Sequence, residues 1–154
     1  MKRIIIILFI SIPYLFFSQN KIGEEYMNGF IVVADSSHVY KRLKIKMFDL
    51  KSKLNIEIDT LGREYNKSKN LISLRENDED EMYAGNYFPR RYPSKSLSLE
   101  YLDYYDSKLK DKTIGLVTGI FDNKNDADRL LTQVKEYSPN AFIMNVEIYM
   151  GCMH

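Results

Sequence analysis

Two separate stretches of the chain show the same succession of hydrophobic patterns. In the first, residues 30–34 form a β-branched run that predicts a strand buried on both faces. Residues 38–54 then place apolar side chains three or four positions apart, which predicts an amphipathic helix. Residues 56–58 alternate apolar and polar side chains, as a half-buried strand does. The helical stripe consists of Val39, Leu43, Met47, Leu50 and Leu54.

The same plan returns near the end of the chain. Residues 113–121 predict a strand, and residues 141–150 predict a longer one after the helix breaker Pro139. We expect Phe142, Val146 and Ile148 to face the helices, which would leave the alternate side chains on the other face. Those alternate side chains include Asn145, Glu147 and Tyr149. Between the two strands, an apolar stripe predicts a helix; it consists of Ala127, Leu130, Leu131, Val134 and Tyr137.

Two strand–helix–strand units of this size predict one α+β domain. They can share a single antiparallel sheet, with both helices on one face and the other face open. The predicted fold is therefore a ferredoxin-like βαβ-βαβ sheet within residues 19–154. Its units span about 29–58 and 113–150, and a long insertion of about 59–112 separates the two halves.

The second unit resembles the start of a SPOR (sporulation-related repeat) domain. The resemblance rests on a Gly and a Phe at the end of the strand, and on an Ala and a Leu pair in the helix. The first unit matches in pattern only, with Ala34 at the glycine position, and Val117 stands where the family often has Gln. The resemblance implies a ferredoxin-like sheet that binds bacterial cell-wall glycan strands on its open face. The matching residues are Gly119, Phe121, Ala127, Leu130 and Leu131.

The amino-terminal segment predicts export. Lys2 and Arg3 precede an apolar run that ends at Phe17, which is typical of a secretory signal peptide. The alternative is a membrane anchor, but the run is shorter than a spanning helix needs and contains Pro13. We therefore expect residues 1–18 to be cleaved after Ser18. The mature protein would be periplasmic or secreted, with no stable membrane span.

The composition excludes several classes of function. With 22 Lys and Arg against 21 Asp and Glu, the net charge of +1 argues against nucleic-acid binding. One cysteine and two histidines leave little material for a metal site, so we expect no metal and no cofactor. Cys152 and His154 lie at the terminus, where an inert thiol is the favoured interpretation. No nucleophile motif or phosphate-binding glycine loop is present, so we expect no catalytic residues and no enzyme.

Two groups of side chains are the predicted ligand-binding residues. The first lies in the insertion, where arginine and aromatic side chains cluster; these groups suit carboxylates and the apolar faces of sugars. The alternative is a packed loop whose arginines neutralise the acidic run 76–81. The second group lies on the sheet face expected to be open. The predicted residues are Tyr87, Arg90, Arg91 and Tyr92 in the insertion, and Asn145 and Tyr149 in the last strand.

The basic helix 38–54 has two interpretations. It could lie on anionic lipid, but its apolar stripe is needed by the core, so a solvated cationic face is favoured. Overall, the sequence predicts an exported, non-catalytic binding module of the bacterial envelope with peptidoglycan glycan as its ligand. The alternative is a periplasmic or secreted protein–protein interaction module.

Overall fold

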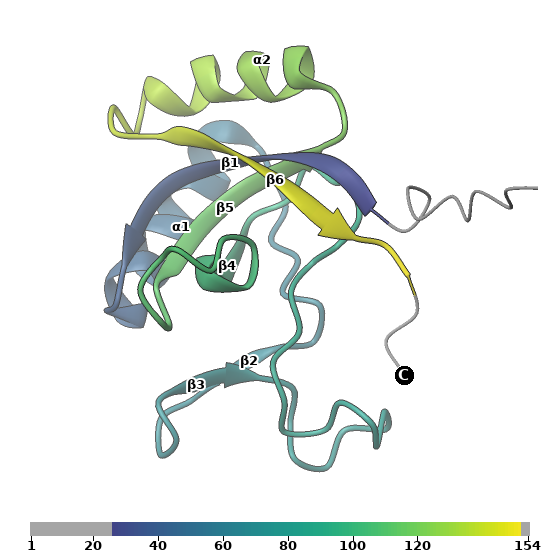
Figure 1. Cartoon of the computed structure of the whole chain (residues 1–154). Helices are drawn as coiled ribbons and strands as arrows, with labels where there is room; N and C mark the ends of the chain where they lie inside the picture. Colours follow the sequence, from purple (N-terminus) through teal and green to yellow (C-terminus); the bar gives the residue numbers. More distant parts are fainter. Residues whose placement is uncertain (1–25, 152–154) are drawn as a thin grey trace, which may run out of the picture.

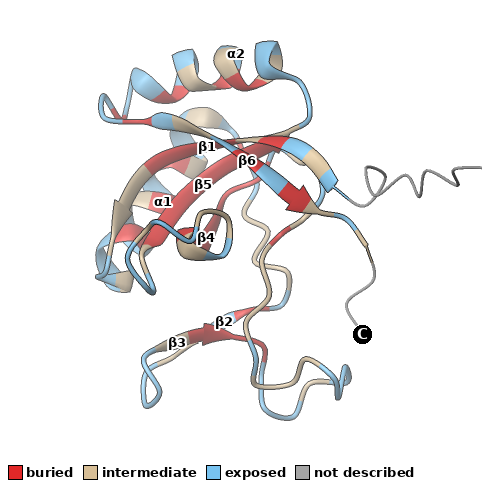
Figure 2. Ribbon diagram, in the orientation of Figure 1, coloured by how far each residue is buried: buried red, intermediate tan, exposed pale blue. Residues whose placement is uncertain are grey.

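A four-stranded antiparallel sheet in the order β4-β5-β1-β6 forms the body of the molecule (Figure 1). The computed structural model describes residues 26–151, so the predicted signal peptide and the terminal Cys152 and His154 lie outside the described residues. The central strand β5 has the longest run of buried side chains, and its neighbour β1 is buried over Ile31–Ala34 (Figure 2). The strands are β1 (Tyr26–Ser37), β4 (Ser98–Tyr101), β5 (Ile114–Phe121) and β6 (Phe142–Tyr149).

Both long helices pack on the same face of this sheet. Helices α1 (Tyr40–Leu54) and α2 (Lys124–Lys135) contribute to one hydrophobic core together with Val32 and Ala34 of β1. The element order and the strand order are those of a ferredoxin-like fold, which confirms the predicted fold class. The buried helical residues are Leu43, Met47 and Leu50 of α1, and Ala127, Leu130 and Val134 of α2.

The strand that completes the first unit lies further along the chain than the pattern predicts. Residues 56–58 make a single bridge, Ile58 to Leu97, and the strand beside β5 is β4. All four residues of β4 are buried, whereas the Glu57 side chain is 78% exposed. Strand β4 occupies the position beside β5 because it is close to β5 in sequence, and a short connection joins the two strands. The long insertion therefore lies inside the first unit, between α1 and β4, and not between the two halves.

The insertion extends from the edge of the sheet and carries a small hairpin (Figure 1). Strands β2 (Glu64–Asn66) and β3 (Leu71–Ser73) pair only with each other. The Tyr101 hydroxyl accepts a hydrogen bond of 2.9 Å from the backbone N–H of Ile72, which ties the hairpin to β4. The chain returns through residues 87–97 and enters β4, and the 3-10 helix η2 (Leu102–Tyr104) follows directly.

The second face of the sheet is covered, which corrects the expectation of an open face. Leu102 of η2 and the half-buried Tyr105 and Leu109 pack over a second hydrophobic cluster on that face. The reason is that β1 and β5 carry large aliphatic side chains on both sides, so both sides must be removed from water. The sheet residues of this cluster are Ile31, Val33, Val117, Ile120, Val146 and Ile148.

Strand β6 has the opposite orientation to the predicted one. Val146 and Ile148 belong to the cluster on the face away from the helices, whereas Ile143 packs against the helix-side core. By alternation, Asn145 therefore shares the helix side, where it is exposed. Among residues 26–151, no helix combines the length and apolar composition needed to cross a bilayer.

Candidate binding site

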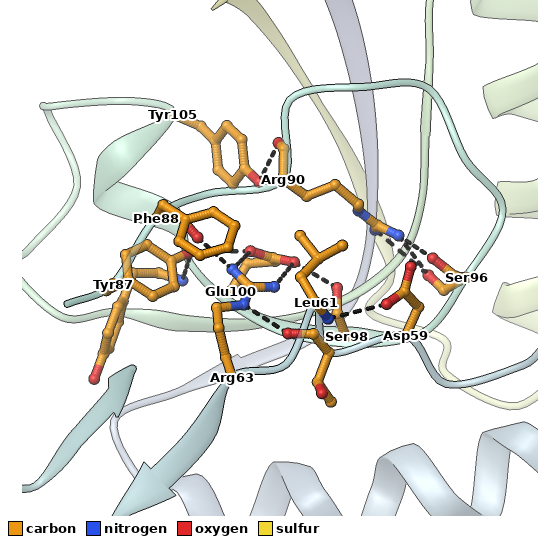
Figure 3. Close-up of polar contacts among 12 residues, drawn as sticks. Asp59, Leu61, Arg63, Tyr87, Phe88, Arg90, Ser96, Ser98, Glu100 and Tyr105 are labelled. Carbon is orange, nitrogen blue, oxygen red and sulfur yellow. Dashed lines mark hydrogen bonds and ion pairs between the residues drawn. The ribbon is translucent and has the colours of Figure 1, made fainter. Parts of the chain in front are cut away.

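A buried ion pair joins the insertion to the sheet. Arg63, which precedes β2, donates from Nη1 and Nη2 to the two carboxylate oxygens of Glu100 in β4, each at 2.7 Å (Figure 3). Both side chains are almost fully buried, with exposed fractions of 1% and 0%. Arg63 also donates to the backbone carbonyls of Thr60 at 2.9 Å and Phe88 at 2.6 Å. One guanidinium therefore fixes three separate segments.

The Glu100 carboxylate has four donors, enough to occupy all of its acceptor positions. Besides Arg63, it accepts hydrogen bonds from the hydroxyls of Tyr87 at 2.9 Å and Ser98 at 2.6 Å. Burial alone raises the pKa of Glu100, but the hydrogen bonds and the charge of Arg63 outweigh it, so the pKa lies below its usual value. Glu100 is therefore a fixed anion and has no free position for a ligand or a proton transfer.

Two tyrosines of the network form rigid supports. Burial, followed by the Glu100 charge, raises the pKa of both Tyr87 and Tyr105 well above the ordinary value, so their hydroxyls stay protonated. Tyr87 accepts from the backbone N–H of Tyr101 at 3.0 Å, and its ring packs edge-on against those of Tyr101 and Tyr104. Tyr105 donates to the carbonyl of Arg90 at 2.8 Å. The orientation of both rings is thus set by hydrogen bonds.

Arg90 is a structural residue, and its predicted role as a surface contact for an anion is wrong. Its side chain is fully buried and donates to the Ser94 hydroxyl at 3.1 Å and to the hydroxyl and carbonyl of Ser96. The adjacent Glu100 makes this burial tolerable, because its charge and that of Arg90 attract each other. Within residues 26–151, neither Arg90 nor Arg91 makes an ion pair with the acidic run 76–81.

Six aromatic side chains surround a cleft of about 350 Å³, which we call the aromatic cleft. Its wall comes from the ends of β1 and β6, from residues 87–91 and from η2 with the residue after it. Tyr26 and Tyr149 meet across the β1–β6 pair with ring centroids 5.3 Å apart. The lining residues are the aromatic Tyr26, Tyr87, Phe88, Tyr104, Tyr105 and Tyr149, together with Pro89, Arg91, Glu147 and Ile148.

Arg91 stands between the aromatic cleft and a second cleft of about 460 Å³, which also contains Tyr92 and Met150. Its Nη1 donates to the carbonyl of Gly151 at 2.8 Å, and its guanidinium lies 6.0 Å from the centre of the Tyr149 ring. In the described part of the chain, no carboxylate lies within 4.0 Å of Arg91. The charged guanidinium of Arg91 is therefore held at the rim of the aromatic cleft by contacts with neutral groups.

The structure brings together most of the predicted site residues. Tyr87, Arg91 and Tyr149 line the aromatic cleft, and Tyr92 lines the adjoining cleft with 46% of its side chain exposed. Asn145 lines neither cleft, although Glu147 and Tyr149 on the same side of β6 line the aromatic cleft.

Sequence reasoning missed Arg63, Glu100 and three of the tyrosines. Strand β4 did show alternation in residues 97–101, and that signal would place Glu100 on one face of a strand. No sequence signal pairs it with Arg63, because the two are brought together only by the tertiary fold. The missed tyrosines are Tyr26, Tyr104 and Tyr105.

Within residues 26–151, no three His, Cys, Asp or Glu side chains are grouped so as to hold a metal ion. Comparisons with protein-family models, with curated proteins and with solved structures gave no match to this chain. The resemblance to SPOR domains thus has no support beyond the residues that suggested it.

Proposed function

We propose that the protein is an exported, non-catalytic binding module of the bacterial envelope, and that the aromatic cleft binds peptidoglycan glycan. The observation that carries the proposal is the set of six aromatic rings around one cleft with Arg91 and Glu147 on its wall. Aromatic faces stack on the apolar faces of sugar rings, and a volume of about 350 Å³ is within the usual range for small-ligand sites.

The rings divide into a rigid base and an accessible rim. Tyr87 and Tyr105 are held by hydrogen bonds to Glu100 and to the carbonyl of Arg90. Tyr26 and Tyr104 are 51% and 57% exposed, so their faces are available to a ligand. A base that is already fixed lowers the entropy lost on binding. This supports recognition of a stiff, ring-containing ligand.

Arg91, the single cation among the described lining residues, suits the carboxylates of cell-wall peptides. Arg91 uses Nη1 for backbone carbonyls, which leaves further guanidinium donors for a planar anion. Among residues 26–151, the only buried carboxylate near the cleft is that of Glu100; its acceptor positions are filled and its pKa is lowered, so it lacks the properties of a general acid. Both facts favour binding over catalysis.

Sedimentation with purified peptidoglycan tests the proposal. The wild-type protein should be retained on intact and on amidase-treated sacculi, since amidase leaves the glycan strands in place. Tyr104→Ala and Arg91→Ala should each weaken retention about ten-fold. Tyr137→Ala is the matched control, because Tyr137 is 42% exposed and lines neither cleft. Equal retention of all four proteins would contradict the aromatic cleft as the site.

A specific feature favours the second candidate, a protein–protein interaction module. Among the described strands, β6 pairs with β1 alone, so the outward-pointing backbone groups along its eight residues are unpaired. Glu147 is its only charged residue, and Phe142 is 39% exposed. Such an edge can accept an extended segment of a partner as a further strand. Absence of retention on every sacculus preparation would favour this candidate.

A further inference from the structure

The outer face of α1 carries two large apolar side chains that the core does not use. Ile45 is 64% exposed and Phe48 is 54% exposed, whereas Leu43, Met47 and Leu50 on the inner face are buried. At 100° per residue, Ile45 and Phe48 lie about 60° apart on the side opposite the core. The helix therefore has a second, exposed apolar stripe beside the one predicted from the sequence.

Basic side chains flank this stripe on both sides. At the same 100° per residue, Lys44 and Lys51 lie on one flank and three basic residues lie on the other, while Lys41 lies within the stripe. The carboxylates of Asp35, Asp49 and Glu57 form ion pairs with basic residues of α1 and offset part of the positive charge of the helix. The outer face remains positive. The three basic residues of the second flank are Arg42, Lys46 and Lys53.

A cleft of about 580 Å³ continues the basic surface from α1 to the hairpin. Tyr40 of α1 and Tyr65 of β2 stack across it with ring centroids 4.1 Å apart, and the ammonium of Lys44 lies 5.8 Å from the Tyr40 ring centre. Lys67, at the hairpin turn, adds another cation to the wall. Aromatic and cationic groups thus surround the exposed Phe48.

We propose that the outer face of α1 binds the surface of an anionic lipid bilayer. Charge complementarity carries this choice, together with the exposure of the apolar stripe: Ile45 and Phe48 are both more than half exposed on the outer side of the helix, and Phe48 also lines the cleft of about 580 Å³. The cations are mostly lysines, which act as point charges and suit a diffuse anionic surface better than a single planar anion. The helix would lie parallel to the bilayer, with Phe48 at headgroup level.

The expected strength follows from the charges. Each Lys or Arg near an anionic membrane strengthens binding roughly five-fold at physiological ionic strength. The interaction should therefore be reversible and sensitive to salt, since the surface potential of an anionic bilayer falls off within about 8 Å at this ionic strength.

Tryptophan fluorescence gives a local test, because the full chain contains no tryptophan. In the F48W variant, emission should shift to the blue with vesicles that contain phosphatidylglycerol, and should not shift with phosphatidylcholine alone. The matched control is F142W on β6, where Phe142 is 39% exposed and the emission should not move. If residues 1–18 alone tethered the protein to the vesicles, both tryptophans would stay in water and neither emission would shift. That result would overturn the proposal.

Charge reversal separates the lipid from other occupants. K41E/K44E in the F48W background should weaken vesicle binding at least about twenty-five-fold, from two roughly five-fold losses. K95E/K108E makes the same change of net charge at exposed positions in other segments and should have little effect. Equal weakening by both pairs would overturn the proposal. A blue shift that rises with protein concentration without vesicles would also overturn it, and would assign the face to contact with a second copy of the chain.

Discussion

The two βα units of this protein are built alike but are completed by different means. In the second unit, β5, α2 and β6 follow one another with short connections, and apolar packing accounts for the contacts between them. In the first unit, residues 55–97 separate α1 from β4, and the strand is held by directed polar contacts as well as by its core side chains. The insertion therefore changes the kind of contact that holds the last strand of the unit in place.

The difference teaches how an insertion without a core of its own can be fixed. Strands β2 and β3 have three residues each and form no sheet with the main body. A hairpin of this size is marginal in water by itself. Arg63 and Tyr87 of the insertion donate to Glu100, and Arg63 also donates to the Phe88 carbonyl, so one strand residue and its arginine partner fix the return path of the chain (Figure 3).

Breaking the buried ion pair should have the largest effect on stability. Arg63→Ala leaves Glu100 as an uncompensated buried charge, and we expect a loss of about 3–5 kcal/mol in the free energy of unfolding. Urea titration followed by circular dichroism measures it. The double variant R63M/E100L should recover most of the loss, because it removes both charges together. Equal destabilisation of the single and double variants would show that the pair is not the cause.

The same pair should make stability depend on acid. The pKa of Glu100 is lowered in the folded state, so its stabilisation is present above the unfolded pKa and is lost as the pH falls through the folded pKa. Urea midpoints should therefore drop below about pH 4.5 in the wild type. Glu100→Gln should show a flatter acid limb between pH 5 and pH 2.5. An unchanged acid limb in this variant would assign the pH dependence to other carboxylates.

Only the parts with local patterns could be predicted from the sequence. The stripes of α1 and α2 and the alternation of β6 are local, so the ferredoxin-like order followed from them. The position of β4 could not be predicted, because residues 56–58 and 97–101 alternate equally well and only pairing with β5 decides between them. The burial of Arg90 was equally hidden, since it depends on serines and on Glu100 that fold around it.

A smaller effect should arise where η2 covers the sheet. A methyl group added at Gly115 of β5 would overlap the Leu102 side chain, whose Cγ would lie 2.7 Å from the new carbon. Gly115→Ala should therefore cost about 1–3 kcal/mol through overpacking. Leu102→Val in the same chain should relieve part of this cost, and urea midpoints measure both. Strict additivity of the two changes would contradict direct contact between these residues.

The helix starts of the two units also differ, and Asn123 should contribute about 1 kcal/mol. Its side chain accepts a hydrogen bond of 2.8 Å from the backbone N–H of Asn125 and caps α2. Asn123→Ala removes that cap, and losses of this kind are typically about 1 kcal/mol. Asn123→Ser preserves the capping oxygen and should restore most of the stability. A serine variant as unstable as the alanine variant would exclude capping as the reason.

The first unit offers the reverse experiment with the smallest expected effect. The N-cap of α1 is Val39, which has extended backbone angles, no side-chain cap and 57% exposure. Val39→Asn should supply the missing acceptor and raise the free energy of unfolding by about 0.5–1 kcal/mol. Val39→Ala is the control, because it changes size without adding an acceptor and should not stabilise. If the asparagine and alanine variants have the same stability, water already satisfies the backbone N–H groups at the start of α1. The difference in capping between the two helices would then not affect the free energy of unfolding.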